Sequence, residues 1–170
     1  MLKNELQVLF ENTPSISYNE KVKSVEDFVI SLKDEVEGIV GGVPGKVAYP
    51  DFFKYKHSFA DGLYIREMIM EKGTMVFSAI HKHSFPFFLL SGHLAISTEK
   101  GVEDFIAPCY IITPRGTKRI GYAIKESTVV TVHKNPDNLR NIEEIDNYNV
   151  VFTWKDYREY INKTDNEKNK

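Results

Sequence analysis

The sequence has little of what several classes of protein require. It contains one Cys in 170 residues, too few for an internal disulfide or a thiolate-rich zinc or iron–sulfur site, and this suits a reducing compartment. No apolar run approaches the roughly 20 residues that a membrane-spanning helix needs. The first residues are too mixed in charge for a signal peptide. We therefore expect a cytoplasmic protein without a membrane partner.

Neither sign of charge is in large excess. Lys and Arg number 22 against 24 Asp and Glu, which gives a formal net charge of -2. Broad binding to nucleic acid needs a strongly basic face, so we expect no nucleic-acid partner. Gly-rich phosphate loops, dinucleotide-binding fingerprints, Ser-centred nucleophile elbows and paired-carboxylate motifs are also missing. Their absence disfavours nucleotide hydrolysis and acyl transfer.

What the sequence does contain is enough apolar residues for a core, with 42% hydrophobic and 12% aromatic positions, which excludes wholesale disorder. Residues 1–58 are predicted to form an N-terminal helical arm and a connecting loop. Ser24 and Asp27 have capping-box spacing, which predicts the start of an amphipathic helix. Its apolar stripe is expected to be Val25, Phe28, Val29, Leu32 and Val36. A shorter helix is predicted from Leu2, Leu6, Leu9 and Phe10. These helices either cover the core or form a docking arm for another subunit.

From residue 59 to residue 134 the period of the apolar residues becomes two. Gly and Pro punctuate this region, and the strands are predicted at residues 63–70, 74–80, 85–91, 93–99, 102–106, 109–113, 119–124 and 127–133. Many short strands at this spacing indicate an antiparallel sandwich or barrel. The run from Phe85 to Leu90 is almost continuously apolar, which predicts either an ordinary core strand or one with its outer face under a helix or a second subunit.

Residues 135–170 are predicted to be a C-terminal helical extension with a frayed tail. Leu139, Ile142 and Ile145 have helical spacing after Asp137 or Asn138 as the cap. A second capping box, formed by Thr153 and Asp156, predicts another short helix.

The segment His81-Lys82-His83 lies where two predicted strands meet. In an extended chain, residues two apart point to the same side, so both imidazoles would face the barrel interior. They would supply half of a site for a divalent transition metal such as Zn, Fe, Mn, Ni or Cu. His133 ends the last strand and could complete a three-imidazole site with an open position. The alternative is that these histidines are ordinary barrel residues.

A small basic cluster follows Pro114, and it comprises Arg115, Lys118 and Arg119. Arg presents a planar fork to carboxylates and phosphates, so this cluster, with Tyr122, is a candidate site for a small anionic ligand at the barrel mouth. The alternative is a solvated turn, or a partner for Glu99, Glu103 or Asp104.

Two segments resemble the motifs of the cupin superfamily. The segment GTMVFSAIHKHSFPFFLLSG is similar to the first motif, with Gly73, His81, His83 and Gly92 in matching places. The segment APCYIITPRGTKRIGYA is similar to the second, through Pro114 and Gly116. The resemblance implies a small jelly-roll barrel. Phe87 and Phe88 stand where the family has a Glu ligand, and Arg119 stands where it has a His.

The fold class we predict is therefore mainly β, a cupin-like jelly-roll β-barrel with an N-terminal helical arm and short C-terminal helices. We expect a non-catalytic binding or structural module, with no catalytic residue assigned, that forms a homo-oligomer or joins a larger assembly. The run from Gly116 to Ala123 also loosely resembles uncharacterised cupin-like proteins of bacterial viruses. That resemblance implies a virion or assembly component, located in the host cytoplasm or the virion. The alternative is a metal-dependent enzyme of the oxygenase or isomerase type that uses His81, His83 and His133.

Overall fold

The fold is taken from a computed structural model, which describes residues 7, 10–13, 17–31 and 53–168. Helix α2 (Tyr18–Ser31) precedes the strands, helix α3 (Ile142–Asn149) follows the eighth strand, and helix α4 (Trp154–Lys168) follows the ninth. Most of the predicted short helix (Leu2, Leu6 and Leu9) lies outside the described residues, as do Leu32 and Val36. None of the described helices is long and apolar enough to cross a membrane.

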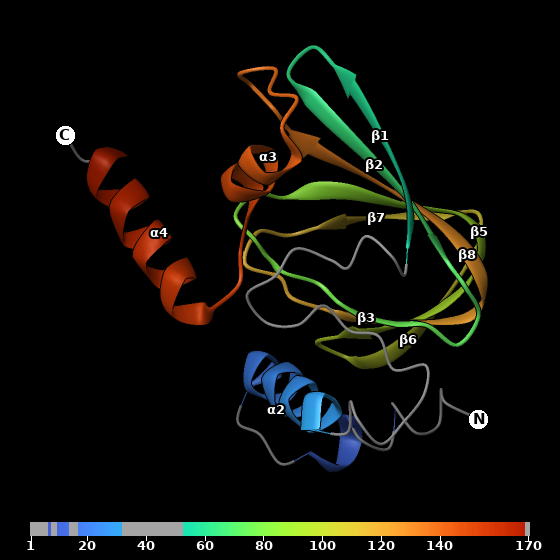
Figure 1. Ribbon diagram of the computed structural model, residues 1–170. Helices are drawn as coiled ribbons and strands as arrows, with labels where there is room; N and C mark the ends of the chain where they lie inside the picture. The colour runs from blue at the N-terminus through green and yellow to red at the C-terminus, as the bar shows by residue number, and fades with distance from the viewer. Residues whose placement is uncertain (1–6, 8–9, 14–16, 32–52, 169–170) are drawn as a thin grey trace.

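The strands of the main sheet pair in antiparallel fashion and curl into a barrel (Figure 1). The sheet order is β1-β2-β8-β5-β6, while β3 pairs with β8 and β7 pairs with β5. Two further strands, β4 and β9, form a small second sheet. The strands are β1 (Lys54–Ala60), β2 (Leu63–Met70), β3 (Met75–Phe77), β4 (Ile80–His81), β5 (Phe85–Thr98), β6 (Gly101–Ile106), β7 (Cys109–Thr113), β8 (Ile120–Lys134) and β9 (Val150–Val151). The predicted fold class, mainly β with a jelly-roll type of antiparallel barrel and helices at both ends, is confirmed.

Two pairs of predicted strands are in fact single long strands. The ranges 85–91 and 93–99 both belong to β5, and 119–124 and 127–133 both belong to β8. The pairing of β5 with β8 shifts register between Leu89 and Leu94, and such bulges bend a strand without ending it. Gly92 therefore lies in a bend of β5 and not in a hairpin turn. The predicted strand at 74–80 is instead divided between β3 and β4.

Strand β1 was not predicted, because all but its last two residues fall in the range 1–58 that the sequence assigns to the arm and loop. It pairs with β2 along its whole length, from Lys54 opposite Ile69 to Ala60 opposite Leu63. Tyr55, His57 and Phe59 recur with a period of two, which is the signal that a strand leaves in a sequence. The sheet therefore begins at Lys54.

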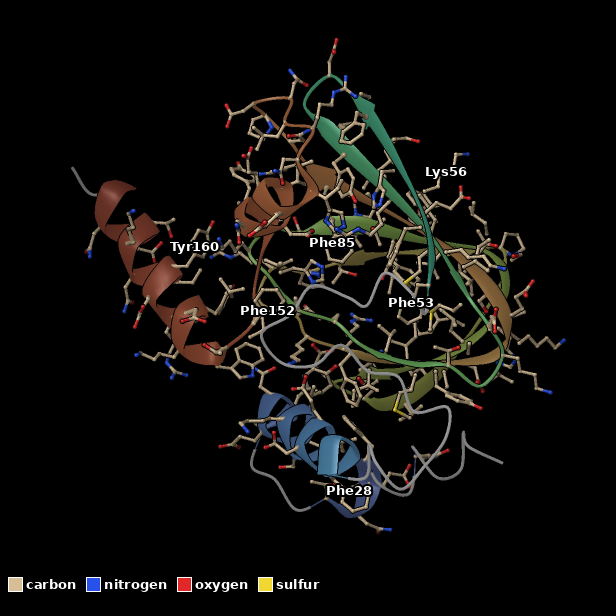
Figure 2. All side chains as sticks on the ribbon, viewed as in Figure 1. Phe28, Phe53, Lys56, Phe85, Phe152 and Tyr160 are labelled. Atoms are coloured by element: carbon tan, nitrogen blue, oxygen red, sulfur yellow. The ribbon has the colours of Figure 1, made fainter. Side chains whose placement is uncertain are left out.

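Helix α2 begins at Tyr18, so the prediction that Ser24 is its N-cap is wrong. The capping box is formed by Ser17 and Glu20 instead: the Ser17 hydroxyl accepts from the Glu20 N–H and donates to the Glu20 carboxylate. An S-x-x-E pattern is the better match to this motif. Val25 is buried as predicted, but Phe28 is 45% exposed and lies on the side of α2 that points away from the barrel (Figure 2).

Two apolar cores lie on opposite faces of the sheet. Inside the barrel are Phe53, Met70, Leu89, Leu94, Ile96, Ala123 and Val129. Between the outer face and α2 are Phe10, Val22, Val25, Met75, Phe77, Ala95, Ile120 and Tyr122. Leu94 and Ala95 are neighbours in β5 but belong to different cores, as the alternation of side chains along a strand requires. The described part of the N-terminal helix therefore covers a core, which was the first of its two interpretations.

The C-terminal helices are capped by local hydrogen bonds. The side chain of Asn141 accepts from the N–H groups of Glu143 and Glu144, so Asn141 is the cap of α3 in place of the predicted Asp137 or Asn138. The predicted Thr153–Asp156 capping box is confirmed, because the Asp156 N–H donates to the Thr153 hydroxyl, which donates to the Asp156 carboxylate.

The apolar run in β5 is buried on its inner side only. Phe85 is 6% and Leu89 0% exposed, whereas Leu90 is 53% exposed. On the neighbouring strand β7, Tyr110 and Ile112 are likewise more than half exposed. The outer face of β5 and β7 therefore carries exposed apolar side chains.

Candidate functional site

One end of the barrel interior contains a cluster of aromatic and charged side chains. Strand pairing places Tyr64 opposite His133 and Arg66 opposite Thr131, and His57 opposite Arg66. Tyr64 and Met70 are almost completely buried, and Arg66 has the same parity in β2. The inner face of β2 is therefore the one that carries Tyr64 and Arg66.

His81 and His133 lie side by side in this cluster. Their ring centroids are 5.7 Å apart and the ring planes differ by 4°. Phe85 lies 4.2 Å from the His81 ring and 4.8 Å from the His133 ring. Figure 2 shows Phe85 near α3, at that end of the barrel. The structure therefore brings these two of the predicted site residues together.

Both imidazoles are neutral near pH 7. Burial lowers the pKa of His81 from 6.5 to about 4, and the positive charges of Arg66 and Arg119 act in the same direction. Burial also lowers the pKa of His133 well below its usual value, with smaller contributions from His81 and Arg66. A neutral imidazole has one nitrogen that donates and one that accepts, and it is also the form that binds metals.

Arg66 is held by an ion pair with Asp146. Its Nη2 donates to the Asp146 Oδ1 at 2.5 Å, and the side chains are 22% and 8% exposed. The Arg66 Nε donates to the Tyr64 hydroxyl at 2.9 Å, which also lies 2.6 Å from the His57 Nδ1. Burial raises the pKa of Tyr64, while the charge of Arg66 opposes this. No motif in the sequence indicated these residues, although the alternation in β2 places Arg66 in phase with buried Met70.

Helix α3 brings Asp146 to this end of the barrel. The strand that follows α3 pairs with β4, with Val150 opposite His81. The Lys82 N–H also donates to the Asn149 carbonyl at 2.8 Å. Asp146 therefore reaches the cluster from an element that is fixed beside His81.

His83 lies apart from the other two predicted metal ligands. Its ring contacts Tyr148 at 5.1 Å and Tyr160 at 6.3 Å, and burial lowers its pKa. The chain bends at residues 82 and 83, so the alternation that would align His83 with His81 ends there. In the described ranges of the chain, no group of three His, Cys, Asp or Glu side chains could hold a metal ion. The structure thus brings together His81 and His133 of the predicted three.

The predicted anion-binding residues are divided between two faces and a turn. Arg115 is exposed on the turn. Lys118 is buried under α2, where its Nζ donates to both carboxylate oxygens of Glu26 at 2.8 and 2.6 Å. Tyr122 belongs to the same outer core. Only Arg119, which has the parity of the interior residue Ala123, faces inward.

This division corrects the prediction of a solvated basic turn, since Lys118 is 6% exposed. It also corrects the predicted partners, because Lys118 pairs with Glu26 of α2 and not with Glu99, Glu103 or Asp104. The physical reason is the alternation just before β8. Neighbouring side chains point to opposite faces there, so a run of basic residues cannot converge on one ligand.

Three polar atoms of the cluster are buried without a hydrogen-bond partner among the described residues. They are the His81 Nδ1, the Arg119 Nε and the Asp146 Oδ2. Leaving a buried donor or acceptor unpaired costs about 1–3 kcal/mol, and more for a charged group. Such atoms are uncommon in native proteins and call for a physical explanation.

No family model and no curated protein matches this chain. Solved structures that are similar to it include a cupin-2 domain protein from Shewanella frigidimarina, with 13% identity and a TM-score of 0.42 over 48% of this chain and 80% of that one. A cupin superfamily protein from Desulfitobacterium hafniense has 11% identity and a TM-score of 0.44 over 54% and 88%. KdgF from Halomonas sp. has 13% identity and a TM-score of 0.44 over 51% and 82%.

Proposed function

We propose that this protein is a non-catalytic binding module whose barrel holds a small anionic ligand beside Arg119. The observation that carries this proposal is the buried and unpartnered Nε of Arg119 among the described residues. A guanidinium is permanently charged and presents its donors in a planar fork that fits a carboxylate or phosphate. An anion at this place would satisfy a donor that the described protein groups leave unpaired.

The charges near His81 support the same ligand class. Two positive groups, Arg66 and Arg119, act on His81. Asp146 neutralises Arg66 through their ion pair, which leaves the charge of Arg119 for a ligand. The neighbouring imidazoles are neutral and add hydrogen-bonding groups without adding charge.

A metal in the barrel is the second candidate, and the parallel pair of neutral imidazoles favours it. His81 and His133 are in the protonation state that binds Zn, Fe, Mn, Ni or Cu. This candidate includes the metal-dependent enzyme that the sequence leaves as an alternative. We favour the anion because the guanidinium of Arg119 acts on the same imidazole and would repel a cation.

A structural role as a homo-oligomer or virion component is compatible with a binding module. Leu90, Tyr110 and Ile112 are each more than half exposed on β5 and β7, and exposed apolar patches are typical of contact surfaces. We propose a second copy of this chain as the partner. Sedimentation of the wild type and of the Ile112→Glu variant tests it: a larger mass that Ile112→Glu reduces supports the proposal, and a monomeric wild type contradicts it.

Calorimetric titration with inorganic phosphate and with succinate tests the anion site. We expect saturable binding to the wild type and at least a tenfold loss in Arg119→Met, which keeps the aliphatic stem but removes the charge. Arg115→Met is the matched control because Arg115 is exposed on the preceding turn, and it should bind like the wild type. Failure of both anions to bind the wild type, or equal binding by Arg119→Met, would contradict the proposal. Elemental analysis showing stoichiometric metal, lost in His81→Asn and His133→Asn, would favour the second candidate.

A further inference from the structure

We infer that the ligand of this site carries a hydroxyl group as well as its anionic group, which makes it a small hydroxylated acid. The inference rests on the proposed function. It comes from a different residue, Asp146, whose second carboxylate oxygen remains unused. Arg66 occupies the Oδ1 of Asp146, while the Oδ2 is buried without a partner among the described residues. An ionised carboxylate oxygen can only accept, so the group that satisfies it must be a donor.

The three unpartnered atoms belong to one connected cluster. Asp146 contacts Arg66, and Arg66 contacts the Tyr64 hydroxyl. The Tyr64 ring stacks on His133 at 6.1 Å, and His133 stacks on His81 at 5.7 Å.

Arg119 joins the cluster through its effect on His81 and through backbone links near it. The His81 N–H donates to the carbonyl of Thr117 at 3.3 Å, two residues before Arg119. The Arg119 N–H donates to the Ser78 hydroxyl at 2.9 Å. Arg119 and Asp146 thus belong to different elements at this end of the barrel: Arg119 lies just before β8 and acts on His81, and Asp146 lies in α3 and contacts Arg66.

The Arg119 Nε is a donor and the Asp146 Oδ2 is an acceptor, and this difference decides the class of ligand. A simple anion would satisfy the Arg119 Nε but would leave the Asp146 Oδ2 unpaired, and it would be repelled by that carboxylate if it came close. A hydroxyl on the same molecule can donate to the Asp146 Oδ2 while the anionic group accepts from Arg119.

A protonated amine could also donate to Asp146, but the surrounding charges favour a hydroxyl. Arg66 already donates to the same carboxylate at 2.5 Å. An ammonium group would therefore lie close to a guanidinium in a partly buried place, where like charges repel strongly. A neutral hydroxyl does not have this cost.

Succinate, malate and aspartate provide the test, because they differ only in carrying a hydrogen, a hydroxyl or an ammonium at one carbon. Each is titrated into the full-length protein, with both enantiomers of malate and aspartate. We expect one enantiomer of malate to bind at least about tenfold more tightly than succinate or aspartate, as one hydrogen bond to a charged group provides. The methyl ether of malate cannot donate and should bind no better than succinate.

The Asp146→Asn variant should bring the ratio of the malate and succinate affinities close to one. Its amide places either an NH2 group, which cannot accept, or a carbonyl oxygen, which is a weaker acceptor, where the Oδ2 was. Asp137→Asn is the matched control, since Asp137 is exposed, and it should keep the ratio. Because the ratio of malate to succinate affinity is taken within each variant, a general loss of affinity cancels. The methyl ether tests donation by the hydroxyl in the wild-type protein, where no residue is changed.

The outcomes separate this inference from the proposed function. If succinate and malate bind equally to the wild type, the inference is wrong and the anion site stands. If aspartate binds more tightly than malate, or if the methyl ether binds as tightly as malate, the inference that the ligand donates through a hydroxyl is wrong. If Asp146→Asn folds and keeps the wild-type ratio, Asp146 is not the acceptor. If none of the acids and no phosphate binds, the proposed function itself fails.

Discussion

The imidazoles of His81 and His133 lie nearly parallel in the barrel, 5.7 Å apart, although 52 positions separate them in the chain. Burial lowers the pKa of both rings, the positive charge of Arg66 lowers both further, and His81 also lowers the pKa of His133. Asp146, at the same end of the barrel, is paired with Arg66. Both imidazoles therefore remain neutral near pH 7.

We predict that the protein loses stability as the pH falls from about 7 toward 4. The pKa of His81 is about 4 in the folded protein against 6.5 ordinarily, and that of His133 is lowered too. Between these values the unfolded chain binds protons that the folded protein does not, so acid favours unfolding. For His81 the loss is on the order of 3 kcal/mol once the pH is below both values.

Urea unfolding at a series of pH values measures this effect. The double variant His81→Asn/His133→Asn should lose less stability on acidification than the wild type does. If the free energy of unfolding of the double variant depends on pH as steeply as that of the wild type, other groups cause the acid sensitivity.

Replacing Glu26 by Gln should destabilise the protein by about 3–5 kcal/mol, because the buried Lys118 ammonium would lose its counter-charge. The two side chains are 6% and 7% exposed. Asp27→Asn on the same helix is the control: its ion pair with Lys23 is more than half exposed, and such pairs contribute only about 0–1 kcal/mol. Chemical denaturation measures both. Equal stabilities of the two variants would contradict the importance of this pair in holding α2 on the barrel.

Gly92→Ala should destabilise the protein by about 3 kcal/mol or more, since overpacking and backbone strain add. A Cβ at Gly92 would lie 2.2 Å from the Glu126 carbonyl oxygen and 2.6 Å from the Ser127 Cα, and φ there is 92°. Gly62→Ala is the control. Its φ is also positive, at 73°, but nothing lies within 4 Å, so it should cost only about 1–2 kcal/mol. Similar melting temperatures for the two variants would be inconsistent with a close approach of β5 to β8 at the bend.

Tyr64→Phe should cost about 1–3 kcal/mol, because it leaves the Arg66 Nε without its acceptor in a largely buried place. Tyr64 is fully buried, whereas Tyr110, the control position, is 67% exposed. Tyr110→Phe should have almost no effect. The comparison is made by urea unfolding near pH 7, and a Tyr64→Phe protein as stable as Tyr110→Phe would mean that water replaces the hydroxyl.

Local patterns in the sequence were enough to predict several elements closely. The range 109–113 is strand β7 and the range 63–70 is strand β2, since a period of two is a property of each strand by itself. The Thr153 capping box was found for the same reason, because it involves neighbours in the chain. The site was predicted in part: His81 and His133 share the interior, but His83 does not, because alternation holds only where the chain stays extended.

The sequence by itself predicted a mainly β fold, an antiparallel sandwich or barrel, because alternating apolar residues can bury one face only as strands of a sheet. It also placed Lys118 and Arg119 in one basic cluster, although neighbouring residues of an extended chain point to opposite faces. Only the tertiary structure decided what each of them meets. Lys118 pairs with Glu26, 92 positions away, and Arg66 pairs with Asp146, 80 positions away. Such partners are brought together by the closure of the barrel and the docking of α2 and α3, which no local pattern specifies.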